Sequence, residues 1–188
     1  MSLYIISFSQ KKVAHPPPLR SFLRRLGKQG ATIERRELPT YPADAIYKCQ
    51  PKAWFLEDIM IEWVDDVLVP YVATALPGII PILFLDSFKV HMLGSVVSKI
   101  QALGVEVEFI PPGCTGLVQP VDVGYNKAFK CKVKDQYFDW LMKQDPDAPI
   151  AKTTRRQVVE WILSAEKNIT TEVIRNAWRK TGYAYFSK

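Results

Sequence analysis

Two aspartates of this sequence have the residue type and the placement for metal-dependent chemistry. Asp86 follows the apolar run 79–85, whose length and composition predict a strand buried on both faces. A carboxylate at the end of such a strand lies where open α/β sheets place their active groups. Asp122 follows Gln119-Pro120 at a predicted helix start, where proline is tolerated and acidic groups are favoured. Nucleases and strand transferases that use two metal ions bring such carboxylates together from distant segments, usually with a third.

Two sequence segments around these aspartates carry a longer pattern. Residues 85–91 read LDSFKVH, and residues 111–124 read PPGCTGLVQPVDVG. The first is similar to the "L-D-x-x-x-x-H" segment of the pogo/Tigger-type DDE superfamily endonucleases, and the second to their "P-P-x-x-T-x-x-x-Q-P-x-D-x-G" segment. The resemblance runs from about residue 30 to the C-terminus and is strongest over 80–132.

The resemblance assigns roles to three residues. It implies that Asp86 and Asp122 are the second and third catalytic carboxylates and that they hold Mg²⁺ or Mn²⁺, hard cations that take carboxylate oxygens. It also implies that His91 contacts a ligand carboxylate or a phosphate without binding the metal itself. Spacing alone leaves structural alternatives open: a helix cap at Asp122, an ordinary strand-end residue at Asp86 and a locally capped histidine.

The first carboxylate of the family pattern has no match. The family carries it on the first strand of its sheet, whereas here no aspartate precedes Asp44, which lies in a proline-rich loop, and the earlier acids are Glu34 and Glu37. With two carboxylates, metal binding is expected to be weak and strand cleavage absent. We therefore expect a transposase-derived nuclease domain that is inactive as this chain. The alternatives are a non-catalytic DNA-binding or protein-interaction domain, and a working nuclease with a substituted acid.

The charge of the chain, together with the family resemblance, indicates DNA as the partner. The net charge is +6 and the pI is near 9.2, which mildly favours a polyanion. Three lysines line one face of a predicted helix and are expected to bind DNA: Lys127, Lys130 and Lys134. We expect neither a membrane nor a small molecule as a further partner. A second candidate is a recognition helix over 171–181, with packing of that helix as its alternative.

Composition sets the class of protein. Hydrophobic residues make up 48% and charged residues 23%, as in an ordinary globular protein. The three cysteines form no CxxC pair, which argues against a disulfide framework or a cysteine zinc site and for a reducing compartment. No apolar run reaches membrane-spanning length, and the N-terminus lacks the pattern of a secretory signal. We expect an intracellular protein, and the resemblance implies a nuclear one.

The periodicity of the chain predicts an α/β fold. Helices are expected over 52–69, 93–103, 120–143, 153–166 and 171–181, with strands over 79–85 and 105–110. Pro70 is expected to stop the first helix. This order implies a partly parallel sheet covered by helices, and it matches the second half of an RNase H-like fold, which the resemblance also implies. Weaker patterns suggest a strand over 3–8, a basic helix over 20–28, a brief strand over 31–33 and a loop over 38–51.

These elements suggest three segments. Residues 1–30 are a poorly defined basic segment, 31–144 are the distal part of an RNase H-like domain (a mixed sheet with flanking helices), and 150–188 are a C-terminal helical appendage. Because the leading strands of the fold are mostly absent, strand 79–85 is expected to lack a neighbour on one side. Phe129, Val133 and Trp140 are expected to share a core-facing side of the long helix with Asp122.

Overall fold

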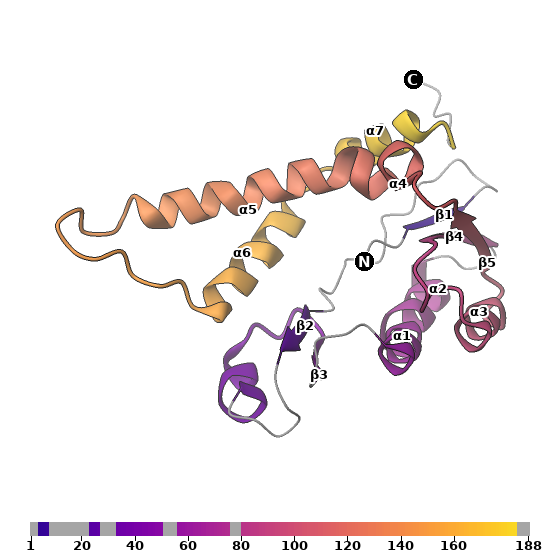
Figure 1. The fold of residues 1–188 in the computed structure, drawn as a ribbon, viewed down its shortest axis with the longest axis horizontal. Coiled ribbons are helices and arrows are strands. Elements are labelled where there is room, and N and C mark those ends of the chain that lie inside the picture. Colours follow the sequence, from indigo (N-terminus) through magenta and orange to yellow (C-terminus); the bar gives the residue numbers. More distant parts are fainter. Residues whose placement is uncertain (1–3, 8–22, 27–32, 51–55, 76–79, 184–188) are drawn as a thin grey trace. The chain divides into compact units, whose positions relative to one another are not determined.

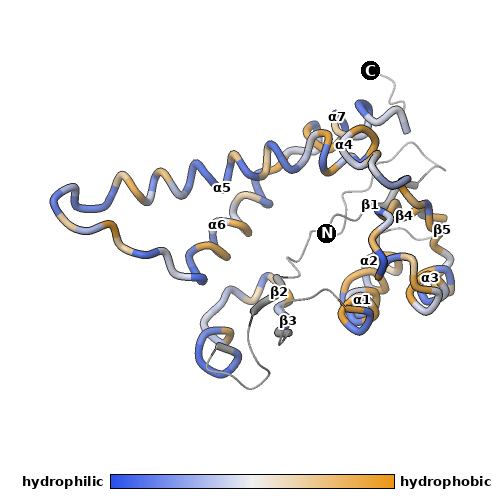
Figure 2. Tube along the Cα trace, viewed as in Figure 1, coloured by the Kyte–Doolittle hydropathy of each residue, from blue (hydrophilic) through white to orange (hydrophobic). Residues whose placement is uncertain are grey.

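The chain forms two compact units in the computed structural model, which describes residues 4–7, 23–26, 33–50, 56–75 and 80–183. The sheet unit comprises Met1–Pro18, Trp54–Asn126 and Thr171–Lys188. The helix-pair unit comprises Leu19–Ala53 and Lys127–Thr170. Within the described residues, no helix has the length and apolar character needed to span a bilayer. Figure 2 shows hydrophobic residues gathered in the helices beside the sheet.

A three-stranded mixed sheet forms the centre of the sheet unit (Figure 1). Its strand order is β1-β4-β5, from β1 (Tyr4–Ser7), β4 (Pro81–Asp86) and β5 (Glu106–Ile110). β4 pairs in parallel with β5 and antiparallel with β1. Leu83 and Leu85 are fully buried, which confirms the predicted buried strand and the mixed α/β class.

The prediction that strand 79–85 lacks a neighbour is wrong. Tyr4 pairs with Phe84 and Ser7 with Pro81, so the N-terminal strand completes the ladder of β4 on that side. The apolar pattern over 3–8 predicted a strand. A local pattern cannot predict that this strand pairs with a strand more than seventy residues later. The central position of β4 satisfies its backbone groups on both sides.

The crossover between the parallel strands follows the prediction. Helix α3 (Gly94–Gln101) connects β4 to β5 along the chain and packs on β5, with Val96 and Ile100 buried. The chain then turns at Gly104, where φ is +74°, a left-handed conformation that glycine adopts without steric cost.

One helical run covers the sheet unit, and Pro70 does not end it. The run consists of α1 (Glu57–Trp63), a π-helical turn η3 (Val64–Leu68) and α2 (Val69–Ala75). In the π-helical turn the N–H of Val69 reaches the carbonyl of Val64, five residues back. Because this wider turn moves the preceding carbonyls out of the usual i−4 position, the proline ring is accommodated. Trp63 and Leu68 are buried, as an amphipathic helix requires.

The C-terminal helix α7 (Thr171–Thr181) also belongs to the sheet unit. It packs on a short helix α4 (Thr115–Val118) and on the π-helical turn η4 (Val121–Tyr125). A Cβ atom on Gly124 would lie 2.8 Å from Cβ of Ala177, so only glycine allows this approach. Trp178 is fully buried, and its ring lies 5.5 Å from that of Phe84 in an edge-to-face arrangement. The helix therefore joins η4 to the central strand.

The first part of the helix-pair unit departs from the sequence prediction. β2 (Leu23–Leu26) pairs in parallel with β3 (Tyr47–Gln50), so the predicted basic helix over 20–28 is wrong at its centre and the predicted loop over 38–51 contains a strand. A π-helical turn η1 (Ile33–Glu37) and a 3₁₀ turn η2 (Leu38–Thr40) lie between them. The brief strand over 31–33 is wrong at Ile33, and the rest of it lies outside the described residues. Pairing with a strand distant in the sequence decides the structure of such short segments, and local propensity does not reveal it.

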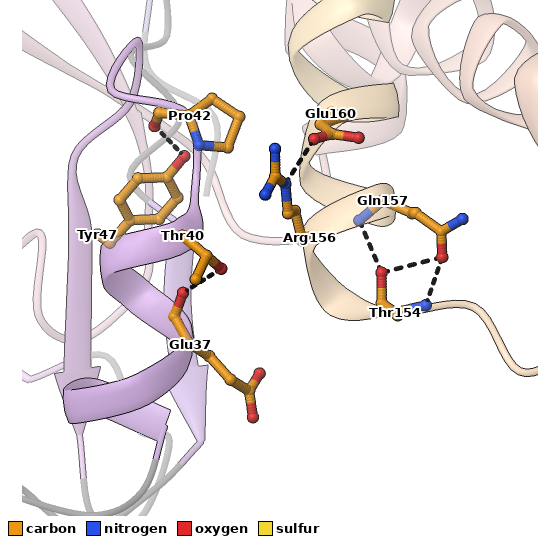
Figure 3. A network of polar contacts seen from close by, with 8 residues as sticks. All are labelled: Glu37, Thr40, Pro42, Tyr47, Thr154, Arg156, Gln157 and Glu160. Atoms are coloured by element: carbon orange, nitrogen blue, oxygen red, sulfur yellow. Dashed lines mark hydrogen bonds and ion pairs between the residues drawn. The ribbon is translucent and has the colours of Figure 1, made fainter.

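Two helices form the rest of this unit: α5 (Asn126–Leu141) and α6 (Arg155–Lys167). Thr154 and Gln157 form a capping box at the start of α6 (Figure 3). Two ion pairs link α6 to the segment 33–50 of the same unit. Arg155 pairs with Glu37 at 3.0 Å, and Lys167 pairs with Asp44 at 2.7 Å.

The prediction of a core-facing side on the long helix is wrong. None of the residues of α5 is buried, and Phe129 and Val133 line an open groove toward α6. The π-helical turn η4 precedes α5 and changes the rotation per residue, so the phase counted from Asp122 does not carry through the helix.

We expect Gly124→Ala to lower the free energy of unfolding by about 1–3 kcal/mol, because the new methyl group overlaps Ala177. The measurement is urea denaturation, with Gly116→Ala as the matched control, since nothing lies within 4 Å of a Cβ placed there. Adding Ala177→Gly to Gly124→Ala is expected to recover part of the loss. An unchanged midpoint in Gly124→Ala would contradict the close packing of η4 on α7.

Alkaline pH should destabilise the sheet unit through Tyr71. Burial on α2 raises the pKa of its phenol from 10.0 to about 12. The unfolded chain therefore loses this proton near pH 10 while the folded chain keeps it. The stability contribution is complete below pH 10 and falls by about 2–3 kcal/mol as the pH rises to 12.

The difference in the free energy of unfolding between the unaltered chain and Tyr71→Phe isolates the contribution of this phenol, because the two chains share all other titrating groups. Denaturant midpoints measured across pH 9 to 12 are expected to fall less steeply in Tyr71→Phe. Tyr137→Phe, at an exposed phenol on α5, serves as the control. Equal pH dependence in all three chains would refute the assignment to Tyr71.

Candidate metal centre

Asp86 is the last residue of β4 and lies at the carboxyl end of the parallel strand pair. Its backbone pairs with Ile110, the last residue of β5. The hydroxyl of Ser87 donates to the carbonyl of Ile110 at 2.5 Å, which links the two strand ends directly. The side chain thus emerges where the sheet stops and backbone groups no longer fill the space, as predicted for an active group.

The Asp86 carboxylate is held by the turn that follows it. Nδ1 of His91 lies 2.6 Å from Oδ1, and since a carboxylate only accepts, the histidine donates through Nδ1–H. The backbone N–H of Phe88 donates to the same oxygen at 3.2 Å, and neither contact uses Oδ2. The His91 side chain is 1% exposed and that of Asp86 is 28% exposed. A buried donor therefore orients a carboxylate that still reaches solvent.

The segment before Asp122 is built from a turn and a buried amide. The N–H of Cys114 donates to the carbonyl of Pro111, and Gly113 has φ of +78°, so Pro112 and Gly113 occupy the middle of a turn that favours proline then glycine. Helix α4 follows at once, and Gln119 after it is 3% exposed. These positions of the motif shape the loop.

Asp122 lies in η4 and is exposed. Nδ2 of Asn126 donates to its Oδ1 at 2.8 Å, a contact between successive helical turns. The motif ends at residue 124 and assigns no role to Asn126, although the i,i+4 spacing of Asp122 and Asn126 could have signalled this bond. Gly124 fixes the depth of the same turn against α7.

The structure brings Asp86 together with His91, and Asp122 together with Asn126. Both aspartates belong to the sheet unit and follow the carboxyl ends of neighbouring parallel strands. Convergence of the two carboxylates on one ion stays a prediction. Their oxygens suit a hard cation in kind, but the described residues hold no group of three His, Cys, Asp or Glu side chains able to bind a metal.

Several acids that could replace the first carboxylate are already engaged. Asp44 pairs with Lys167, Glu37 with Arg155, and Asp65 with Lys99 at 2.7 Å. Glu57 on α1 accepts a hydrogen bond from Ser95. These contacts occupy the acids in structural roles.

The predicted DNA-contacting lysines are exposed on α5. Lys127, Lys130 and Lys134 follow one another along the helix, and Nζ of Lys134 lies 5.2 Å from the centre of the Phe138 ring. Their role in DNA binding stays a prediction. For α7 the packing alternative is observed: Ile174, Ala177 and Trp178 are buried, and Arg179 pairs with Glu172 at 2.8 Å.

Three known proteins are similar to this chain. The chain is 27% identical to the mouse "Pogo transposable element with KRAB domain" and 26% identical to the human protein of that name, in each case over 91% of this chain and 31% of the relative. It is 27% identical to the mouse "Jerky protein", over 82% of this chain and 27% of that protein. The chain thus spans about a third of the length of these relatives. No solved structure matches it.

The family comparison is broader than the motifs. The family model of the DDE superfamily endonucleases matches residues 25–178, which is most of the chain. This match confirms the resemblance predicted from the residues around Asp86 and Asp122. The chain belongs to the DDE superfamily endonucleases, as a pogo/Tigger-like, transposase-derived domain.

Proposed function

We propose that this chain is the distal part of a transposase-derived DDE catalytic domain, which binds DNA and does not cut it as the chain stands. The observation that carries the proposal is the Asp86 carboxylate, oriented by buried His91 at the carboxyl end of β4. Asp86 and Asp122 are the catalytic carboxylates of this site, and His91 positions the first of them. The ancestral reaction is metal-dependent DNA strand cleavage and transfer.

The cation that this site would take is Mg²⁺ or Mn²⁺, and Asp86 and Asp122 would hold it. When bound, such a cation supplies Lewis-acid stabilisation of phosphoryl transfer. Two carboxylates meet only part of the coordination that these ions require, so the binding is weak. Asn126 orients Asp122 in the same way that His91 orients Asp86.

The fold of the proposed domain is RNase H-like over 31–144. The succession of β4, α3 and parallel β5, followed by helical turns, supports this architecture. Residues 1–30 and 150–188 are the flanking segments of the proposal, although α7 of the latter packs against the turn that carries Asp122. A DNA-acting domain of this kind works in the nucleus.

A second candidate is a domesticated, non-catalytic domain that binds DNA or protein. The ion pairs of Asp44, Glu37 and Asp65 favour it, because each of these acids is paired with a basic side chain of the fold. The two candidates share the DNA-binding surface of α5 and differ in whether Asp86 and Asp122 still bind a cation.

We expect no plasmid nicking by this chain in Mn²⁺, because the first carboxylate is missing. The assay compares the unaltered chain with Asp86→Ala, and both are expected to leave the plasmid supercoiled. Nicking by the unaltered chain that disappears in Asp86→Ala would overturn the proposed inactivity and favour a substituted acid. An extended chain that supplies an upstream strand-end aspartate is expected to nick.

Manganese binding tests convergence separately from cleavage. Electron paramagnetic resonance of free Mn²⁺ is expected to show weak uptake that either Asp86→Asn or Asp122→Asn removes. Asp135→Asn, at an exposed position of α5, is the matched control. If only one of the two aspartate variants loses Mn²⁺ uptake, the two carboxylates do not share an ion.

DNA binding should depend on salt through α5. Replacing Lys127, Lys130 and Lys134 with glutamine is expected to weaken binding to duplex DNA of any sequence and to lower the slope of log Kd against log salt by about 3. The control replaces three other lysines with glutamine: Lys132, Lys143 and Lys152. If both triple variants lose the same DNA affinity, the effect depends on net charge alone, and the assignment of Lys127, Lys130 and Lys134 as the DNA contacts is refuted.

A further inference from the structure

An open groove between α5 and α6 has no place in the proposed reaction. Its volume is about 450 Å³, and it lies wholly within the helix-pair unit. Its walls are Phe129, Val133 and Tyr137 from α5 with Val158, Trp161 and Ile162 from α6. Figure 1 shows the two helices diverging toward the long loop that joins them.

The groove has a fixed apolar floor. Tyr137 and Trp161 meet edge to face with ring centres 6.0 Å apart, and Trp140 lies 6.0 Å from Trp161. The side-chain amide of Gln136 donates to the carbonyls of Lys132 and Trp161, which bridges the two helices beside these rings. The cluster holds the helices together without filling the space between them.

The rim of the groove is positively charged. Lys130 and Lys134 from α5 are the charged lining residues, and no acid lines the groove. Within the described part of the chain no ion pair is formed by either lysine, whereas cations of α6 are paired, as Arg156 is with Glu160 at 2.8 Å. An occupant must therefore combine apolar groups with negative charge.

The dimensions fit a helix. From Phe129 to Tyr137 the groove follows two turns of α5, about 12 Å. Anchors at positions i, i+4 and i+7 of an amphipathic helix span about 10 Å.

Nucleic acid fits the same surface less well. The ring of Trp161 already meets Tyr137 and Trp140, so it gives bases little face for stacking. Apart from Phe129, the remaining apolar walls are the aliphatic side chains of Val133, Val158 and Ile162. We propose that the α5–α6 groove binds an acidic amphipathic helix of a partner protein, its apolar anchors in the groove and its carboxylates on Lys130 and Lys134.

This interaction surface goes beyond the proposed function. Because Lys130 and Lys134 also belong to the proposed DNA surface, helix and DNA compete for them. The two roles separate experimentally, since peptide binding is measured without DNA and depends on the apolar walls.

The test uses a labelled peptide of about 15 residues with leucines at i, i+4 and i+7 and glutamates beside them. Fluorescence anisotropy with the full chain is expected to show binding, and none with a scrambled peptide of the same composition. The double variant K130E/K134E is expected to bind the peptide about tenfold more weakly. The matched control is Lys132→Glu, at an α5 position outside the groove, and it is expected to bind normally.

A charge swap keeps the result independent of folding. A peptide with lysines in place of the glutamates should bind K130E/K134E more tightly than the unaltered chain. Equal binding of the ordered and scrambled peptides, or equal losses in K130E/K134E and Lys132→Glu, would overturn the proposal. Binding of oligothymidylate but of neither peptide, lost on Ile162→Glu, would assign the groove to nucleic acid instead.

Discussion

The burial of β4 between two strands is the constraint on which the sheet unit depends. Its backbone groups form hydrogen bonds with β1 on one side and with β5 on the other. Most of its side chains are buried. A carboxylate cannot be tolerated along such a strand without a partner, so the first place for one is its end. Asp86 occupies that end, and buried His91 gives it a defined orientation. The position of the candidate site follows from the burial of the strand.

Helix α7 makes the second carboxylate part of the same architecture. Trp178 packs on Phe84, two residues before Asp86, while Ala177 contacts Gly124, two residues after Asp122. One helix from the C-terminal region thus touches the immediate surroundings of both carboxylates. Its apolar face stabilises the fold, which is the packing role that the sequence allowed as the alternative to a recognition helix.

Local patterns predicted much of the fold and some of the site. The buried strand, the crossover helix and both C-terminal helices follow from apolar periodicity. The passage through Pro70 was missed because a π-helical turn has no periodic signature. The β1–β4 pairing and the contact of Gly124 with Ala177 were missed because they join distant segments. The motif led to Asp86 and His91, whereas their contact required coordinates.

The motif itself distinguishes poorly between an active and an inactive domain. Gly113 makes a turn, Gln119 is buried, Gly124 permits helix packing and His91 is buried beside a carboxylate. Each of these residues stabilises the fold whether or not DNA is cut. Asp122 differs, because it is exposed and its carboxylate accepts a hydrogen bond from Asn126 on the next helical turn, a surface contact that contributes little to the stability of the fold. Packing therefore does not explain the presence of Asp122, and the chemistry of its carboxylate carries information about function that the buried motif residues do not.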